Sequence, residues 1–234
     1  MGVKIMIKNI LITGCSSGLG LALTKLYLEK GYKVFGISRR KPDIENENFT
    51  FKEFDLSRLE TIKEELTTFI SDIKELDTVF LNAGMLGEIK EITKLSTKEI
   101  QEVLNLNVFA NKELLDILAE IKTDTVVGIS SGASKNGSKG WGSYSLSKSS
   151  LNMLLNLYSK EMVNTKLLAI APGVIETPMT DYIRFDIDDE VFTSAKTLKN
   201  GEIQKPEDAA KRLFETLKRK DEFESGSFLD VRKI

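Results

Sequence analysis

A tyrosine and a lysine one helical turn apart indicate acid–base chemistry in a chain that contains no histidine. Tyr144 is followed four residues later by Lys148, a spacing that on a helix brings the ammonium near the phenol, where its charge favours the phenolate. Without histidine, the usual proton shuttle and the commonest metal ligand are both missing. Proton transfer must therefore come from a carboxylate, the single cysteine, a lysine or a tyrosine, and we expect no metal site. The pair alone is weak evidence for catalysis, because such pairs also occur on solvated helix surfaces.

A glycine-rich turn near the N-terminus predicts a nucleotide site. The segment Thr13-Gly14-Cys15-Ser16-Ser17-Gly18-Leu19-Gly20 directly follows an apolar run over residues 9–13. Glycines at such a strand-to-helix junction permit a tight turn and let backbone N–H groups approach a pyrophosphate at the helix N-terminus. The alternative is a tight turn without a ligand. A kinase or NTPase loop is disfavoured, because no Gly-Lys-Ser/Thr follows.

The end of the next strand indicates which nicotinamide cofactor the site prefers. An acidic residue there would hydrogen-bond the adenosine ribose of NAD, but this chain has Ser38, Arg39 and Arg40. Two guanidinium groups suit bidentate capture of a 2′-phosphate. NADP(H) is therefore favoured over NAD(H), and the alternative is that both arginines are solvated turn residues.

Short apolar runs alternate with longer amphipathic stretches along the whole chain. Because strands separated by helices need right-handed crossovers, this pattern predicts a single-domain, Rossmann-type α/β fold, a doubly wound parallel sheet of about seven strands with helices on both faces. Ser96-Thr97-Lys98-Glu99 is a capping-box start for a long helix. The expected strands cover 9–13, 32–37, 49–54, 78–81, 125–130, 166–170 and 227–231, and the expected helices 18–30, 57–70, 96–121, 144–162 and 206–218.

Residues 173–204 are the one long stretch of weak periodicity. In a compact domain such a length is typical of a lid or binding loop. We therefore expect a substrate-binding lid there, within one dinucleotide-binding and catalytic domain over residues 1–234.

Taken together, the motifs resemble the short-chain dehydrogenase/reductase (SDR) family in its classical form. The resemblance runs in order from about Lys8 to Val231 and implies an oxidoreductase that transfers a hydride between NADP(H) and a ketone, aldehyde or alcohol. The matching motifs are Thr13-Gly14-x-x-x-Gly18-x-Gly20, Asn82-Ala83-Gly84, Asn107, Ser131 and Tyr144-x-x-x-Lys148.

The resemblance implies catalytic roles for four residues. Tyr144 would be the general acid–base that exchanges a proton with the substrate oxygen, and Lys148 would hold the nicotinamide ribose and lower the pKa of the phenol. Ser131 would hydrogen-bond and polarise the substrate oxygen, with Ser130 as a competing assignment that the spacing disfavours. Asn107 would stabilise a helix bend and hold a water in the proton path.

The resemblance also implies a set of cofactor-binding residues. Asp55 would contact the adenine amino group, although an N-terminal helix cap is the alternative, and Thr177 would lie near the nicotinamide carboxamide. The set comprises Gly14, Ser16, Ser17, Gly18, Leu19, Gly20, Ser38, Arg39, Arg40, Asp55, Leu56, Asn82, Ala83, Gly84, Tyr144, Lys148, Pro172, Gly173, Val174 and Thr177.

Apolar side chains near the expected site favour a moderately apolar carbonyl substrate. Trp141, the only tryptophan, stands three residues before Tyr144, and ordinary packing is the alternative role for it. The expected pocket residues are Met85, Trp141, Met179 and Tyr182, with Leu86, Phe185 and Phe192 as further candidates.

Composition limits the partners and the compartment. The net charge is −2 with mixed signs throughout, so we expect no nucleic-acid partner and no membrane partner. One cysteine excludes an internal disulfide and fits a reducing compartment. The apolar stretch within residues 1–8 is too short for a signal peptide, and no apolar run approaches a membrane span. A cytoplasmic protein is expected.

Two expectations concern assembly and alternative function. Relatives of the resembled family imply a homo-oligomer, a dimer or a tetramer, but the C-terminus lacks the Asp-Gly-Gly ending that is common among them. The main functional alternative is a non-catalytic NADP(H)-binding sensor or scaffold of the same fold. Such relatives usually lose the tyrosine or the lysine, and this chain retains both Tyr144 and Lys148.

Overall fold

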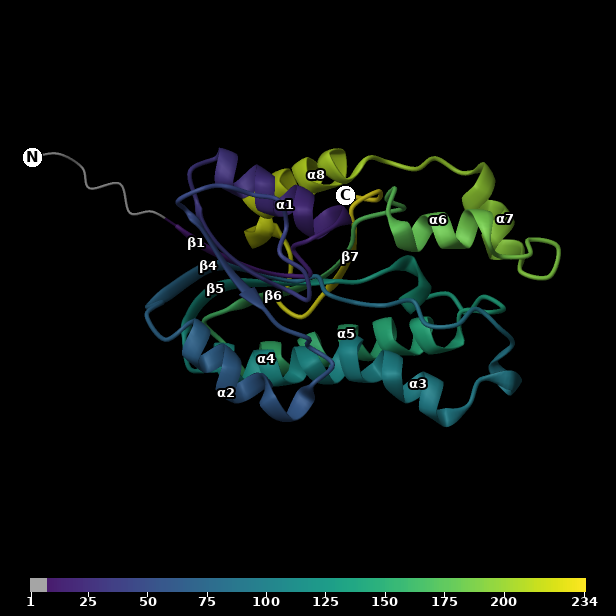
Figure 1. Cartoon of the computed structure of the whole chain (residues 1–234), viewed down its shortest axis with the longest axis horizontal. Coiled ribbons are helices and arrows are strands. Elements are labelled where there is room, and N and C mark those ends of the chain that lie inside the picture. Colours follow the sequence, from purple (N-terminus) through teal and green to yellow (C-terminus); the bar gives the residue numbers. More distant parts are fainter. Residues whose placement is uncertain (1–7) are drawn as a thin grey trace, which may run out of the picture.

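One parallel sheet of seven strands forms the centre of the computed structural model, which describes residues 8–234 (Figure 1). The strand order is β3-β2-β1-β4-β5-β6-β7, and every neighbouring pair is parallel. The predicted Rossmann-type fold is therefore confirmed. The strands are β1 (Asn9–Thr13), β2 (Lys33–Ser38), β3 (Phe49–Glu53), β4 (Glu75–Leu81), β5 (Lys122–Ile129), β6 (Lys166–Ala171) and β7 (Phe228–Asp230).

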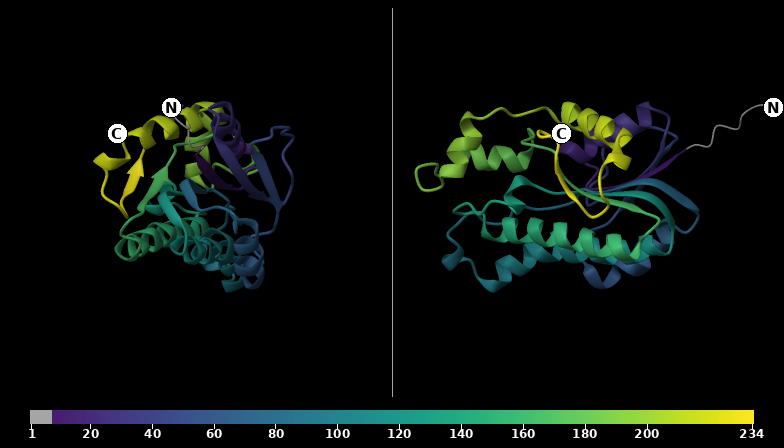
Figure 2. Two further views of the ribbon diagram at one scale, coloured as in Figure 1. Left: turned by 90° about the vertical axis from the view of Figure 1, so that its left-hand side faces the viewer. Right: turned by 180° about the vertical axis from the view of Figure 1, so that it is seen from behind.

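Helices cover both faces of the sheet. Helices α1 and α8 pack together on one face, whereas α2, α4 and α5 cover the other, as the views in Figures 1 and 2 show. The helices are α1 (Gly18–Glu29), α2 (Leu59–Phe69), α3 (Thr97–Leu104), α4 (Ala110–Ala119), α5 (Gly142–Glu161), α6 (Pro178–Phe185), α7 (Thr193–Asn200) and α8 (Pro206–Lys218).

Successive residues of the central strands contribute to two separate cores. Ile10 and Ile12 of β1 belong to the cluster formed with α1 and α8, while Leu11 between them belongs to the cluster formed with α2, α4 and α5. Because side chains alternate across a strand and both faces are buried, the strands read as continuous apolar runs. This is why the sequence indicated them clearly.

Helix α5 lies unusually close to β5. A Cβ atom at Gly128 of β5 would stand 2.5 Å from Leu155 Cδ1 of α5, so a larger residue there would force Leu155 to move. Leu151 and Leu155 are fully buried against the sheet. This close packing fixes the position of α5 relative to the end of β5. Helix α5 carries Tyr144 and Lys148.

The long helix predicted over 96–121 is interrupted. Ser96 and Glu99 form the predicted capping box, but a widened π-helical segment over Asn105–Phe109 separates α3 from α4. Such segments insert an extra residue into a helical turn and are frequent at functional sites. The inserted turn carries the fully buried Asn107.

The stretch of weak periodicity over 173–204 contains two short helices, α6 and α7. Thr177 caps α6 by accepting a hydrogen bond from the backbone of Thr180, and Pro178 occupies the first helical position. Each helix has only eight residues, which is too short to produce a clear periodic pattern. We keep the name lid for residues 173–204.

Within residues 8–234, no helix combines the length and apolar character that a bilayer span requires. Residues 1–7, which hold most of the segment in which no signal peptide was expected, lie outside the described residues.

Replacing Leu151 by Ala should destabilise the fold, because it leaves a cavity between α5 and the sheet. We expect the free energy of unfolding to fall by about 2–5 kcal/mol, measured by urea denaturation. Met153→Ala is the matched control on the same helix, since that side chain is 59% exposed. Equal losses in the two variants would contradict the described packing of α5.

Candidate active site

The glycine turn after β1 has a geometry that only glycine allows. Gly14 and Gly18 have φ values of 69° and 51°, in the left-handed region that other residues avoid. A Cβ at Gly20 would lie 2.1 Å from the carbonyl oxygen of Gly14. The helix therefore starts directly against the turn, and Gly20 serves this packing.

The N-terminus of α1 is open to an anion. Ser17 occupies the N-cap position, but its side chain makes no capping hydrogen bond within the described part of the chain, and the first turn of α1 carries no acidic residue. The first N–H groups of a helix lack partners inside the helix and carry partial positive charge. This end of α1 can therefore hold a phosphate group.

Asn82 ties the glycine turn to the neighbouring strand. Its side-chain Nδ2 donates to the carbonyl oxygens of Thr13 at 2.9 Å and Gly14 at 3.2 Å, and its backbone N–H donates to Thr13 Oγ1 at 2.9 Å. The strand order reverses between β1 and β4, and ligands of this fold bind at that crevice.

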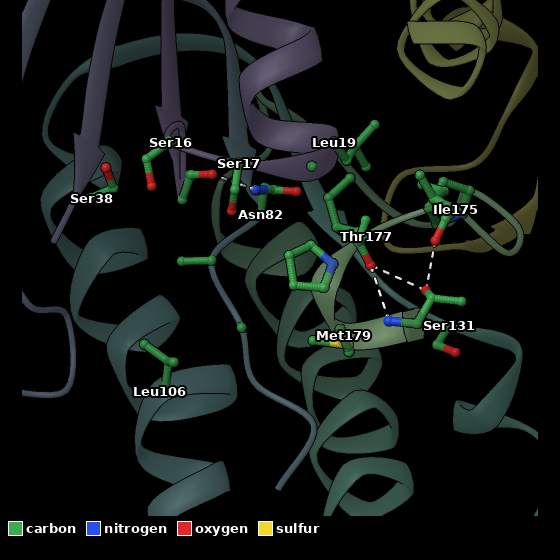
Figure 3. Close-up of a pocket in the computed structure, with 18 of the residues that line it drawn as sticks. Ser16, Ser17, Leu19, Ser38, Asn82, Leu106, Ser131, Ile175, Thr177 and Met179 are labelled. Atoms are coloured by element: carbon green, nitrogen blue, oxygen red, sulfur yellow. Dashed lines mark hydrogen bonds between the residues drawn. The ribbon is translucent and has the colours of Figure 1, made fainter. Parts of the chain in front are cut away.

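A cavity of about 440 Å³ runs from the glycine turn to Tyr144 along the carboxyl ends of the strands, and Figure 3 shows the part of it between Ser16 and Ser131. This volume is in the range of small-molecule sites. Most of the residues expected at the site line this cavity. They are Gly14, Ser16, Ser17, Gly18, Leu19, Ser38, Arg39, Arg40, Asp55, Leu56, Asn82, Ala83, Gly84, Ser131, Trp141, Tyr144, Lys148, Pro172, Gly173, Val174, Thr177 and Met179.

One end of the cavity is cationic. Arg39 and Arg40 are exposed there, and Ser38 Oγ donates to the carbonyl oxygen of Arg40 at 2.7 Å. This hydrogen bond holds the turn that presents both guanidinium groups at the rim.

Asp55 stands beside the two arginines and does not cap a helix. Helix α2 begins at Leu59 with Arg58 as its N-cap, so the capping alternative is wrong. Asp55 Oδ1 instead accepts from the backbone N–H and the hydroxyl of Ser57, at 3.0 and 2.8 Å. Burial opposes ionisation, but these hydrogen bonds and the charge of Arg39 together hold the pKa of Asp55 below its usual value.

Tyr144 and Ser131 meet at the other end of the cavity. Burial raises the pKa of the Tyr144 phenol, and the nearby Ser131 hydroxyl partly offsets this effect by hydrogen bonding. Loss of solvent dominates, so the net pKa of Tyr144 lies above its usual value, and the expected lowering by the Lys148 charge stays a prediction. The Lys148 ammonium lies 5.6 Å from the centre of the Tyr144 ring.

Lys148 is held in a buried position on the end of β5. The residue is 5% exposed, and its Nζ donates to the carbonyl oxygen of Ile129 at 2.7 Å. Burial lowers the pKa of Lys148 to about 8, because the charged form loses its hydration. The ammonium is thus close to its titration range at neutral pH.

Of the two candidate serines, Ser131 is the one placed beside the phenol. Ser130 lies on the cavity lining too, but its hydroxyl donates to Asn152 Oδ1 at 2.6 Å. The Ser131 hydroxyl accepts from the backbone N–H of Ala133 at 3.2 Å, which leaves its proton available to a ligand.

Asn107 lies behind the cavity and braces its floor. Its Oδ1 accepts from the backbone N–H of Met85 at 2.8 Å, and its Nδ2 donates to the Met85 carbonyl at 2.8 Å and to Ser147 Oγ at 2.9 Å. A Cβ at Gly84 would meet Asn107 Oδ1 at 3.1 Å and Lys148 Nζ at 3.5 Å. Glycine at position 84 thus lets these two side chains approach each other.

Thr177 joins the lid to the glycine turn. Its methyl carbon would lie 2.9 Å from a Cβ placed at Gly18, while its hydroxyl caps α6. Beside it, Gly173 adopts a φ of 91°, and Gln204 Nε2 donates to the carbonyl oxygen of Pro172. The segment over the Tyr144 end of the cavity is therefore held from two sides.

The structure places two of the four expected substrate-pocket residues on the cavity lining. Trp141 and Met179 line the cavity, whereas Met85 and Tyr182 lie outside its lining and are each 36% exposed. Of the further candidates, Leu86 and Phe192 pack in a small apolar cluster under the lid, and Phe185 is 72% exposed.

Several apolar residues of the cavity were missed by the sequence analysis. Most lie within helices or at strand ends and carry no motif, while Phe54 and Ile175 lie beside expected cofactor residues without having been assigned a role themselves. They are Ile37, Phe54, Leu106, Ile129, Ile175, Pro178, Ile183 and Leu198, together with Thr180.

Within residues 8–234, no group of three His, Cys, Asp or Glu side chains is arranged to hold a metal ion.

Known proteins resemble the chain over nearly its whole length. The sequence model described as short chain dehydrogenase matches residues 8–188. Benzil reductase ((S)-benzoin forming) from Bacillus subtilis (strain 168) is 31% identical over 240 residues, which cover 96% of this chain and 98% of that protein. The protein of the same name from Bacillus cereus is 31% identical over 248 residues, covering 96% and 99%. The crystal structure of the KRED1-Pglu enzyme matches with a TM-score of 0.80 and 25% identity, covering 95% of this chain and 100% of that one.

Replacing Lys148 by Met should show how much the buried ammonium lowers the unfolding free energy at neutral pH. Because the pKa of Lys148 is lowered to about 8 in the folded protein, the folded state binds fewer protons than the unfolded state between that pH and the usual lysine range. The wild-type protein should gain about 2 kcal/mol in unfolding free energy, relative to the variant, between pH 7 and pH 9.5.

Urea denaturation at the two pH values measures this difference. Lys211→Met, at an exposed position of α8, controls for the general effect of losing a lysine. A wild-type advantage that is the same at both pH values would contradict the burial of Lys148.

Proposed function

The chain belongs to the short-chain dehydrogenase family and is an oxidoreductase that acts on carbonyl or alcohol groups, and we propose that it uses NADP(H) to reduce apolar ketones. The observation that carries this proposal is one cavity with a phosphate-binding helix end and two guanidinium groups at one side and the Ser131 and Tyr144 hydroxyls at the other.

The chain's own residues fit an NADP(H) molecule along the cavity. The open N-terminus of α1 would hold the pyrophosphate, and Arg39 and Arg40 would pair with the 2′-phosphate. Asp55 would accept from the adenine amino group, and Lys148 would donate to the nicotinamide ribose. When bound, the reduced nicotinamide supplies the hydride that reaches the carbonyl carbon.

Tyr144 would supply the proton in the reducing direction. Burial raises the pKa of its phenol, so the phenol is protonated near neutral pH and can donate to the substrate oxygen as negative charge develops there. The Ser131 hydroxyl would donate a second hydrogen bond to the same oxygen. The proton returns to Tyr144 in the reverse direction, when an alcohol is oxidised.

Lys148 and Asn107 would support this proton transfer from behind. The ammonium of Lys148 is protonated at neutral pH, since its pKa is about 8, and its positive charge would stabilise the phenolate that Tyr144 becomes after it gives up its proton. Asn107 fixes the backbone at Met85 and the side chain of Ser147 beside it.

An aromatic 1,2-diketone such as benzil is the substrate class that we propose. Trp141 and Tyr144 pack edge to face, with ring centres 6.0 Å apart and an angle of 62° between the planes. Met179, Ile183 and Leu198 add apolar surface to the same end of the cavity. Benzil reductases are also among the relatives that match nearly the whole chain.

Tyr144→Phe should abolish turnover while leaving NADPH binding intact, because it removes only the proton donor. We expect the rate of benzil-dependent NADPH oxidation to fall by at least about 100-fold, with an NADPH dissociation constant within twofold of wild type. Tyr32→Phe, in the turn between α1 and β2, is the matched control. Undiminished turnover in Tyr144→Phe would contradict the role of the phenol, and loss of turnover in both variants would assign the effect to folding.

Arg39→Ala should weaken NADPH binding selectively. Loss of a charge-assisted pair with the 2′-phosphate should raise the NADPH dissociation constant about 10- to 100-fold, with little change for NADH, as measured by fluorescence titration. Arg212→Ala, at an exposed position of α8, controls for net charge. Equal effects on the two cofactors would contradict the assignment of the 2′-phosphate to this arginine.

A further inference from the structure

We propose that Ser194, in the lid helix α7, is a positioning residue that sets the size of accepted substrates by fixing the indole of Trp141. The catalytic consequence rests on the proposed function, while the contact itself stands on the structure. No motif in the sequence pointed to Ser194.

The contact joins two segments that are distant in the chain. Trp141 Nε1 donates to Ser194 Oγ across a sequence separation of 53 residues. Trp141 immediately precedes α5 and is half-buried on the cavity wall beside Tyr144. Because a buried indole N–H needs an acceptor, the Ser194 hydroxyl selects one orientation of the ring.

The contacts around Trp141 show how the lid and the loop before α5 meet. A Cβ at Gly140, whose φ is 91°, would lie 2.6 Å from Phe192 Cδ1, so the lid and the loop before α5 touch closely. The apolar residues that surround Trp141 there include Ile89, Ile183 and Ala195. The edge-to-face contact with Tyr144 holds the indole on its other side, and the hydrogen bond to Ser194 is the directional contact that the lid supplies.

The lid is attached differently at its base and at helix α7. At its base, Gln204 N–H donates to the Val174 carbonyl at 3.1 Å, and Glu176 N–H donates to the Gln204 carbonyl at 2.9 Å. At α7, the Trp141–Ser194 contact joins side chains only. Backbone pairing thus fixes where the lid begins and ends, and the side-chain contact couples α7 to the wall of the pocket.

A change at Ser194 should therefore weaken the binding of bulky substrates and leave the rate of the catalytic step unchanged. With Ala at position 194, the indole loses its acceptor and can turn into the space that an aryl group would fill. The Michaelis constant for benzil should rise about three- to tenfold, the effect of losing one hydrogen bond, while that for the small diketone 2,3-butanedione stays within twofold. The kcat for both diketones and the NADPH dissociation constant should also stay within twofold, because Tyr144, Ser131 and Lys148 are unchanged.

The single tryptophan gives a direct readout of the contact, because all indole fluorescence comes from Trp141. In Ser194→Ala, the acrylamide quenching constant of the NADP⁺-saturated protein should rise about twofold, since a freed indole is more accessible to the quencher. Ser194→Thr keeps the hydroxyl and should restore both the quenching and the benzil Michaelis constant. Thr197→Ala, which removes a hydroxyl from the same helix, should behave as wild type.

A double-mutant cycle tests whether Ser194 acts through Trp141. Trp141→Phe removes the same donor, so adding Ser194→Ala to it should raise the benzil Michaelis constant by less than twofold further. Multiplicative effects would overturn the inference, as would wild-type quenching in Ser194→Ala or equal effects on both diketones. Failure of the proposed function gives a different result, the absence of turnover in the wild-type protein, and the quenching measurement then decides whether Ser194 holds the indole.

Discussion

The hydrogen bond from the Lys148 ammonium to the Ile129 carbonyl is the interaction on which the site depends. It places a buried cation of α5 on the end of β5, directly before the two serines that follow that strand. It is possible because Gly128 lets α5 approach the sheet closely. The same helix carries Tyr144 one turn earlier, so helix, strand end and serine loop are held as one rigid unit.

The two halves of the cavity are built on different principles. At the glycine-turn end, glycines at positions 14, 18 and 20 satisfy severe steric limits, and the open N-terminus of α1 lies beside them. At the other end, side chains of the lid and of the loop before α5 form the wall. Backbone geometry cannot change without loss of the turn, whereas the side chains of the wall can vary freely. Under the proposed function, cofactor binding is therefore the constrained property and substrate choice the adjustable one.

The sequence was sufficient to predict the elements whose structure follows from local chemistry. Strands buried on both faces give unbroken apolar runs, and the glycine turn reflects a steric need at Gly14 and Gly20. Helices α6 and α7 could not be predicted, because their apolar residues pack against Leu86 and Ile89, far away in the chain. The net direction of the Tyr144 pKa shift could not be predicted, since sequence spacing reveals a neighbouring charge but not the loss of solvent. Preference for NADP(H), the cytoplasmic location and the homo-oligomer stay predictions.

The two ends of the lid lie next to each other, which affects how this segment can change during evolution. The lid leaves and re-enters the body at one short backbone pairing between Val174, Glu176 and Gln204, so its two ends are neighbours in space. Changing the length of a connection between fixed, adjacent ends costs little, about 0.6 kcal/mol for each doubling. Insertions, deletions or whole exchanges of this segment can thus alter substrate repertoire during evolution while the sheet and the dinucleotide cradle persist unaltered.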